Sequence, residues 1–460
     1  MTRIILGMLV LFLFFSCTEK VKKEKLPNII FIYSDDQRHD AAGFNGNEFI
    51  LTPVLDKMAE KGLRFSNANV VFSLCSPSRA ALVTGRYGSA NGVLHLGSDL
   101  NPGEKTVASY LKESGYSTAM AGKWHIGREP KDAGFDFYSY FEGNGTYYGR
   151  KINDIGNIVN PDIHCDEYCV NRSIDFLKEA ANKDQPFFLF HNTQLPHMNG
   201  KLVWDAKEET LSKYKSEKMP VAKNRFDNLA DKPEYLKMVR NKTQAEMYGY
   251  PDSVAIQKHT KEYYSVITEM DDFLGRLFKT VEDLGLMENT YLFFMSDNGW
   301  MLGDHGFTSK VLPYRPSTRV PLFVLGPGIQ PGNNENLVLN IDMTPTILEL
   351  AGVKIPENIH GKSILDILKG GQQNIRDKFV YEGLGNYGGA KPNLTVISKD
   401  YRYIVTYEDE KLEKVNFIEL YNQNNDSDEM VNLASDTKYD DVVKDFEAEI
   451  QHHRNTVLTY

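Results

Sequence analysis

The stretch Asn28-Ile-Ile-Phe-Ile-Tyr-Ser34, followed at once by Asp35-Asp36, decides the fold. A continuous apolar run of this length, bounded by Pro27 and two carboxylates, predicts a strand that is buried on both faces. Such strands occur in mainly parallel sheets that helices cover on both sides. The start of the chain therefore predicts an α/β fold.

Three later segments repeat this pattern: Pro186-Phe-Phe-Leu-Phe190, Tyr291-Leu-Phe-Phe-Met295 and Val320-Pro-Leu-Phe-Val-Leu325. Apolar residues at three- and four-residue steps over residues 263–281 predict a long amphipathic helix before the run at Tyr291. Alternation of strands and helices predicts a large, mainly parallel sheet sandwiched by helices.

Polar residues follow the first three predicted strands. Ligands bind beyond the carboxyl ends of strands in open α/β sheets, so we expect these residues to converge on one site. They are Asp35-Asp36 after the first strand, His191 and His197 after the second, and Asp297-Asn298-Gly299 after the third.

The pattern of predicted secondary structure changes after about residue 373. Short strand-like runs at 378–382, 394–398, 401–407 and 417–421 are separated by turn residues, and a helical pattern starts near Asp440. We predict a catalytic α/β domain over 27–372 and a C-terminal subdomain over 373–460 with a smaller antiparallel sheet plus a helix.

The N-terminus resembles a bacterial lipoprotein signal over residues 1–17. A basic residue, a short apolar run and Ser16 precede Cys17, which would be the lipidated first residue of the mature chain. The apolar run is short for a transmembrane helix, and an ordinary cleaved secretion signal is the alternative. The polar residues 18–26 suit a tether. Either interpretation predicts export, and the first predicts a lipid anchor at the periplasmic face or the cell surface as the membrane contact.

The net charge and the cysteine spacing argue against two kinds of function, nucleic-acid binding and zinc binding. A net charge of −10 and 41% hydrophobic residues indicate a large folded core and argue against nucleic acid as a partner. Cys165 and Cys169 lie four residues apart in a helical pattern, which is compatible with a bridge or with two thiols, and their spacing does not favour a zinc site.

The segment Cys75-Ser-Pro-Ser-Arg79, continuing to Thr84-Gly-Arg86, carries the most specific pattern. A cysteine at a helix start next to an arginine would favour a bound anion, but a buried structural cysteine is also compatible with it. The full pattern resembles the signature of the formylglycine-dependent sulfatases of the alkaline phosphatase superfamily. Further landmarks of that family follow in order: Gly122-Lys-Trp-His-Ile-Gly127, Pro196-His197, Ser296-Asp-Asn-Gly299, Lys310 and Arg319-Val-Pro321.

The resemblance implies an alkaline phosphatase-like fold and a set of site residues. A maturase would oxidise Cys75 to formylglycine, whose hydrated aldehyde is the nucleophile. One Ca²⁺ would be bound by Asp35, Asp36, Asp297, Asn298 and an oxygen of modified Cys75, a set of hard oxygen donors that suits this ion. Arg79 and Lys123 would hold the formylglycine, and His125 would take a proton as sulfate is expelled. His197 would be the general acid, and Lys310 would bind the sulfate.

The resemblance also implies that the substrate is a sulfated carbohydrate from a glycosaminoglycan, a mucin or an algal glycan. Residues 141–150, including Tyr147, and residues 199–252 are candidate substrate walls. One departure is Arg315, where many relatives carry glutamate after the tyrosine; it would face substrate or pair with a carboxylate. The alternatives are a phosphonate monoester or phosphodiester hydrolase on the same scaffold, and a catalytically silent glycan-binding lipoprotein.

Overall fold

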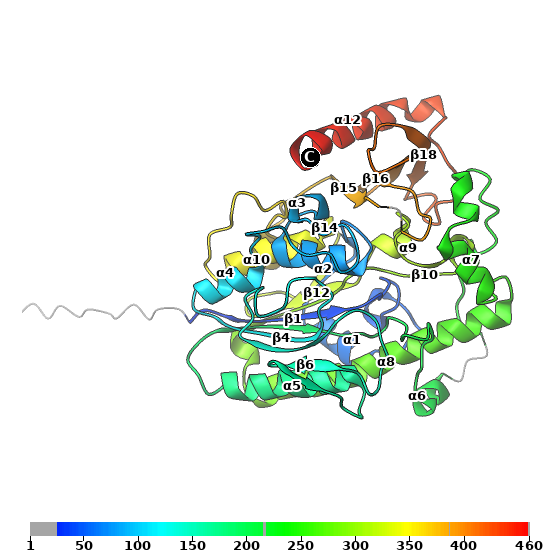
Figure 1. The fold of residues 1–460 in the computed structure, drawn as a ribbon. Helices are drawn as coiled ribbons and strands as arrows, with labels where there is room; N and C mark the ends of the chain where they lie inside the picture. The colour runs from blue at the N-terminus through cyan, green and yellow to red at the C-terminus, as the bar shows by residue number, and fades with distance from the viewer. Residues whose placement is uncertain (1–24, 215–217, 386, 459–460) are drawn as a thin grey trace, which may run out of the picture.

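The computed structural model describes residues 25–214, 218–385 and 387–458 and has a ten-stranded sheet at its centre (Figure 1). The strands β9, β1, β8, β4 and β5 in the middle of the sheet are parallel to one another. Across the sheet the order is β13 (Gly332–Asn334), β2 (Leu63–Phe65), β12 (Leu322–Leu325), β9 (Thr290–Ser296), β1 (Asn28–Ser34), β8 (Phe187–Asn192), β4 (Ser117–Lys123), β5 (Phe137–Phe141), β6 (Ile152–Asp154) and β7 (Asn157–Val159). The predicted mainly parallel sheet is confirmed.

All four predicted strands are present, but the last of them runs against its neighbour. β12 pairs antiparallel with β9, with Leu322 opposite Met295. After β9 the chain passes through Asp297 and Lys310, which both lie at the carboxyl edge, and β12 therefore starts at that edge and runs back. The sequence pattern marks a buried strand but carries no information on its direction.

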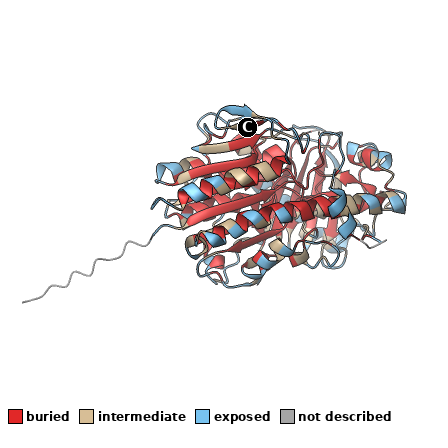
Figure 2. Cartoon of the chain, turned by 90° about the horizontal axis from the view of Figure 1, so that it is seen from below, coloured by how far each residue is buried: buried red, intermediate tan, exposed pale blue. Residues whose placement is uncertain are grey.

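Helices cover both faces of the sheet (Figure 1). One face packs against α1 (Pro53–Glu60), α5 (Cys165–Ala180) and α8 (Ser253–Asp283), and the other against α2 (Cys75–Thr84), α4 (Val107–Glu113) and α10 (Met343–Leu350). The predicted amphipathic helix lies within α8. Its apolar side is turned to the sheet and its polar side is exposed, as Figure 2 shows.

The C-terminal part forms a four-stranded antiparallel sheet, as predicted. It consists of β15 (Lys378–Gly383), β16 (Asn393–Ser398), β17 (Tyr401–Tyr407) and β18 (Val415–Asn422) in sequence order. The helix α12 (Asp440–Thr456) packs on one face through Phe446 and Ile450. The other face packs on the catalytic part through Tyr381 and Ile404. The boundary at residue 372 stays a prediction.

The predicted lipoprotein signal with Cys17 lies outside the described residues. Within the described part of the chain, no helix is long and apolar enough to cross a membrane. Cys165 and Cys169 are buried free thiols on α5, so of the two alternatives the structure has the reduced pair.

Candidate active site

The register between β1 and β9 brings two distant acidic pairs together. Ser34 lies opposite Ser296 in this parallel pair, so Asp35-Asp36 and Asp297-Asn298 leave the sheet side by side. The backbone N–H of Asp36 donates to Asp297 Oδ1 at 3.0 Å, and Asn298 Nδ2 donates to Asp36 Oδ1 at 2.6 Å. All four side chains are fully buried. The residues predicted to bind the metal thus form one cluster at the carboxyl edge of the sheet.

Cys75 is the first residue of α2 and points into this cluster. Its thiol lies 3.6 Å from Asp35 Oδ1, and the ammonium groups of Lys123 and Lys310 both contact its sulfur. Burial raises the pKa of the Cys75 thiol to about 12 despite the two lysines. The unmodified side chain is therefore a neutral thiol.

Arg79, one turn further along α2, ties the helix to both sides of the cluster. Its Nη2 lies 2.9 Å from Asp297 Oδ2, and its Nη1 donates to the carbonyl of Lys123 at 3.0 Å. Because this guanidinium is buried, water screens its positive charge only weakly, and the charge attracts any anion that enters the site.

Lys123 reaches the site because β4 and β8 approach closely at Gly122. A Cβ atom there would lie 1.6 Å from the carbonyl oxygen of Asn192, and φ is +107°, so the position requires glycine. Lys123 then forms an ion pair with Asp35 and donates to Asn144 Oδ1 at 2.8 Å.

His125 follows β4 with a left-handed backbone, φ +61°, which is uncommon outside glycine and is often found at functional sites. Burial, together with Lys123 and Arg79, lowers the pKa of His125 to about 2. Its Nδ1 is buried and has no partner among the described residues. The ring is thus a neutral imidazole with a free ring nitrogen, as a proton acceptor requires.

His197 approaches the cluster from the loop after β8. Its Nε2 lies 3.4 Å from Asp36 Oδ2, and its Nδ1 donates to the carbonyl of Met198 at 2.6 Å. Burial lowers the pKa of His197 to about 3, so the ring is neutral in the substrate-free protein. Tyr147 supports this loop by donating from its hydroxyl to the His197 carbonyl at 2.7 Å.

Lys310 lies between Ser309 and Val311, which both have left-handed backbones with φ of +71° and +81°. Its ammonium group pairs with Asp36. Asn241 on α7 (Arg240–Met247) donates from Nδ2 to the Lys310 carbonyl at 2.8 Å, which fixes the position of this turn.

The acidic cluster fits a divalent cation with oxygen ligands. Asp36 Oδ2 and Asn298 Oδ1 are buried acceptors without a donor among the described residues, although buried polar atoms usually have a partner. Burial and the neighbouring Asp35 raise the pKa of Asp297 to about 7. A bound Ca²⁺ or Mg²⁺ would satisfy the two oxygens and relieve the repulsion between the carboxylates.

The pocket that opens onto Cys75 differs in part from the predicted walls. Tyr147 is 2% exposed and supports His197 instead of lining the pocket. The pocket is lined around Cys75, His197 and Lys310 by Leu96, Asn144, Met198, Leu202, Arg240, Gln244, Trp300 and Tyr387. Asn144 belongs to the predicted wall 141–150, and Leu202, Arg240 and Gln244 belong to the predicted wall 199–252. Tyr387 comes from the loop between β15 and β16 and has no sequence signal.

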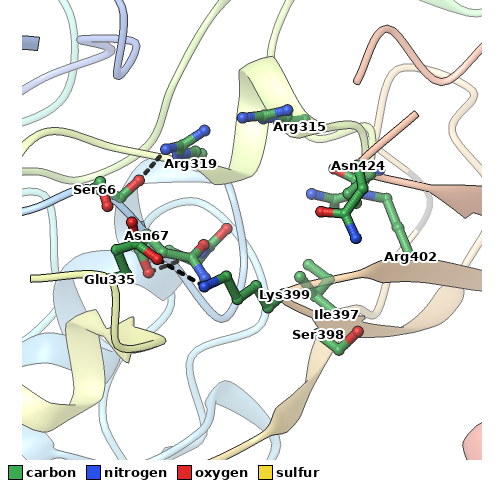
Figure 3. A pocket seen from close by; sticks show the side chains of 12 residues that line it. Ser66, Asn67, Arg315, Arg319, Glu335, Ile397, Ser398, Lys399, Arg402 and Asn424 are labelled. Carbon is green, nitrogen blue, oxygen red and sulfur yellow. Dashed lines mark hydrogen bonds and ion pairs between the residues drawn. The ribbon is translucent and has the colours of Figure 1, made fainter. Parts of the chain in front are cut away.

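Arg315 lies away from this pocket. It begins α9 (Arg315–Thr318) and lines a different cavity, next to Arg319 and between α9 and the C-terminal strands (Figure 3). Its backbone N–H donates to Glu429, and its guanidinium has no ion pair with a carboxylate among the described residues. The substrate-facing role of Arg315 stays a prediction.

Comparison with known proteins identifies the class of enzyme that this fold and site define. The sulfatase family model matches residues 27–353, and the model for the C-terminal part of N-sulphoglucosamine sulphohydrolase matches residues 303–456. The chain therefore belongs to the sulfatase family and is a sulfuric ester hydrolase.

Individual relatives match over almost the full chain. An N-acetylglucosamine-6-O-sulfatase of Bacteroides thetaiotaomicron is 27% identical over 92% of this chain and 86% of its own length. An ulvan-active sulfatase of Formosa agariphila is 28% identical over 91% and 82%. A solved structure with its substrate D-glucosamine-2-N,6-O-disulfate is 25% identical, with a TM-score of 0.83 over 94% of this chain and 98% of the other.

Proposed function

We propose that the protein removes O-sulfate from carbohydrates, with a formylglycine made from Cys75 by a maturase and with one bound Ca²⁺. The observation that carries the proposal is the position of Cys75, which touches Lys123 and Lys310 at the edge of a buried oxygen-donor cluster. The relatives named for N-acetylglucosamine-6-sulfate and ulvan, and the neighbour with a disulfated glucosamine, support a sugar as the substrate.

Each residue has a role that follows from its place. Asp35, Asp36, Asp297 and Asn298 would hold the cation, which supplies positive charge to the oxygens of the sulfate. The formylglycine would supply the attacking hydroxyl. Arg79, Lys123 and Lys310 place fixed cations around the same oxygens, where charge develops in the transition state. His125 accepts a proton, and His197, which is neutral in the substrate-free protein, must first take up a proton and then donates it to the departing alcohol oxygen.

The substrate class is tested with a panel of esters. Protein co-expressed with a maturase is expected to hydrolyse singly sulfated monosaccharides or glycan fragments faster, by kcat/KM, than phosphonate monoesters and phosphodiesters. Preference for the phosphorus esters would favour the alternative hydrolase on this scaffold. Binding of sulfated glycans without turnover of any ester would favour the catalytically silent lipoprotein.

We also propose that the protein is exported and anchored by a lipid on Cys17. Cys17→Ala is expected to move the protein from the membrane fraction to the soluble exported fraction, because the acyl chains supply the membrane affinity. Fractionation of wild type and variant followed by immunoblotting measures this shift. Retention of the variant in the membrane fraction would contradict a lipid anchor at Cys17.

The two histidines are expected to respond differently to the leaving group. A sugar alkoxide needs a proton to depart, whereas a nitrophenolate leaves readily without one. His197→Ala should therefore slow hydrolysis of a sugar sulfate by about 10² to 10⁴-fold and that of nitrophenyl sulfate far less. His125→Ala should slow both substrates alike.

The measurement is kcat and kcat/KM for both variants on both substrates. Equal losses for His197→Ala on the two leaving groups would contradict its role as general acid and would leave it a positioning residue. If His125→Ala loses more activity on the sugar sulfate than on nitrophenyl sulfate, His125 would be the general acid and His197 the proton acceptor.

A further inference from the structure

Arg240 is the one cation lining the Cys75 pocket, among the described residues, that no acidic side chain neutralises. Lys310 is paired with Asp36, and the lysine and arginine behind Cys75 are held by Asp35 and Asp297. Among the residues that the structure describes, the hydroxyl of Tyr387 is the only side-chain hydrogen-bond partner of the Arg240 guanidinium, at 3.4 Å. It is exposed at the mouth of the pocket, and the described lining residues include no carboxylate.

The backbone around Arg240 is fixed relative to the reactive groups. The N–H of Arg240 donates to the Gly388 carbonyl at 2.8 Å, which joins α7 to the loop that carries Tyr387. The next residue, Asn241, is buried and donates to the carbonyls of Thr308 and Lys310 at 2.7 and 2.8 Å. Arg240 and Lys310 are therefore two cations held on one hydrogen-bonded unit.

The walls of the pocket that these two cations line combine apolar surface with placed polar groups. Leu96, Leu202 and Met198 offer apolar surface, and the indole N–H of Trp300 is buried without an acceptor among the described residues. Trp300 packs edge-on against His197, with ring centroids 6.2 Å apart. Apolar walls with a few placed polar groups are typical of small-molecule sites.

We infer that Arg240, together with the Tyr387 hydroxyl, forms a subsite for a second anionic substituent, a sulfate or a carboxylate, on the glycan whose sulfate ester reaches Cys75. The inference rests on the proposed function, because it assumes that a sulfated glycan occupies this pocket. A guanidinium binds planar or tetrahedral oxyanions through two N–H groups, and hydrogen bonds to charged groups are stronger than neutral ones. The enzyme would then prefer glycans that carry an additional negative charge.

The test compares Arg240→Ala with wild type on a substrate that has one sulfate and on two that have a second anion. The probes are glucosamine-6-O-sulfate, glucosamine-2-N,6-O-disulfate and a 6-O-sulfated disaccharide with a uronate. Wild type is expected to prefer one or both dianionic probes, and Arg240→Ala should reduce that preference in kcat/KM by about 10 to 100-fold. If Arg240→Ala loses the preference for the disulfated probe, the group that Arg240 binds is a sulfate. If it loses the preference for the uronate-containing probe, the group is a carboxylate.

Lys237→Ala is the matched control. Lys237 lies three residues before Arg240 and forms a surface ion pair with Glu234, so this substitution also removes one positive charge. It should keep the wild-type preference. Arg240→Lys should show an intermediate loss, because it retains the charge but not the forked donor. An unchanged preference in Arg240→Ala, or an equal loss in Lys237→Ala, would overturn the subsite.

A binding measurement separates failure of the subsite from failure of the proposed function. Protein made without the maturase keeps the Cys75 thiol, and titration calorimetry with the same probes measures affinity without turnover. If wild type binds a dianionic probe more tightly and Arg240→Ala loses this advantage, the result supports the subsite. If the matured enzyme nevertheless hydrolyses none of the probes, that lack of hydrolysis rejects the proposed function alone. Equal affinity of wild type and Arg240→Ala for every probe would overturn the subsite whatever the activity.

Discussion

Cys75→Ala is expected to abolish hydrolysis of sulfate esters, with a loss of about 10⁶-fold in kcat, the scale of loss when an enzyme loses its nucleophile. The alanine keeps the start of α2 and removes only the sulfur that Lys123 and Lys310 contact. The fold should therefore survive the change. Circular dichroism and thermal unfolding verify this before activity is measured on a sugar sulfate.

The same residue is tested chemically by mass spectrometry of the peptide that contains position 75. Active, matured protein should have lost the thiol mass there, and protein made without the maturase should retain it and be inactive. Cys169→Ala is the matched control, because Cys169 is also a buried free thiol but lies on α5 away from the acidic cluster. An intact thiol at position 75 in fully active enzyme would reject the formylglycine.

Asp297→Ala is expected to eliminate the bound cation and to reduce activity by about 10³-fold or more, since a metal contributes several kcal/mol to transition-state stabilisation. The substitution also removes the nearer of the two carboxylates that pair with buried Arg79, because Asp297 lies 2.9 Å and Asp35 4.0 Å from its Nη2, and breaking a buried ion pair costs about 3–5 kcal/mol of folding free energy. Asp297→Asn keeps the volume and one oxygen, so it separates loss of the cation from loss of the fold.

The measurement is the calcium content of each purified protein together with kcat on a sugar sulfate. Wild type treated with a chelator should become inactive and should regain activity when Ca²⁺ is added back. Asp297→Asn should bind Ca²⁺ weakly and should regain activity only at a much higher Ca²⁺ concentration. Full activity of chelated, metal-free wild type would contradict the metal assignment.

The sequence by itself determined the fold class and the set of candidate site residues around Cys75. Buried strands appear as continuous apolar runs because both faces of a covered sheet exclude water, and the run at Asn28 therefore predicts a strand buried on both faces, which is β1 in the structure. The signature at Cys75 is equally local, because one turn of α2 carries both Cys75 and Arg79 to the cluster. Asp36 and Asp297 could be placed together because carboxyl ends of neighbouring parallel strands meet at one edge.

Only the tertiary structure decided which residues line the pocket at Cys75. Tyr147 lay in a predicted wall, yet packing turns it to the His197 carbonyl, and Arg315 faces another cavity with Arg319. Arg240 and Tyr387 meet at the pocket although 147 positions separate them. The physical reason is that strand and helix patterns record local burial, whereas the walls of a pocket depend on how loops from distant elements pack, which no short-range periodicity encodes.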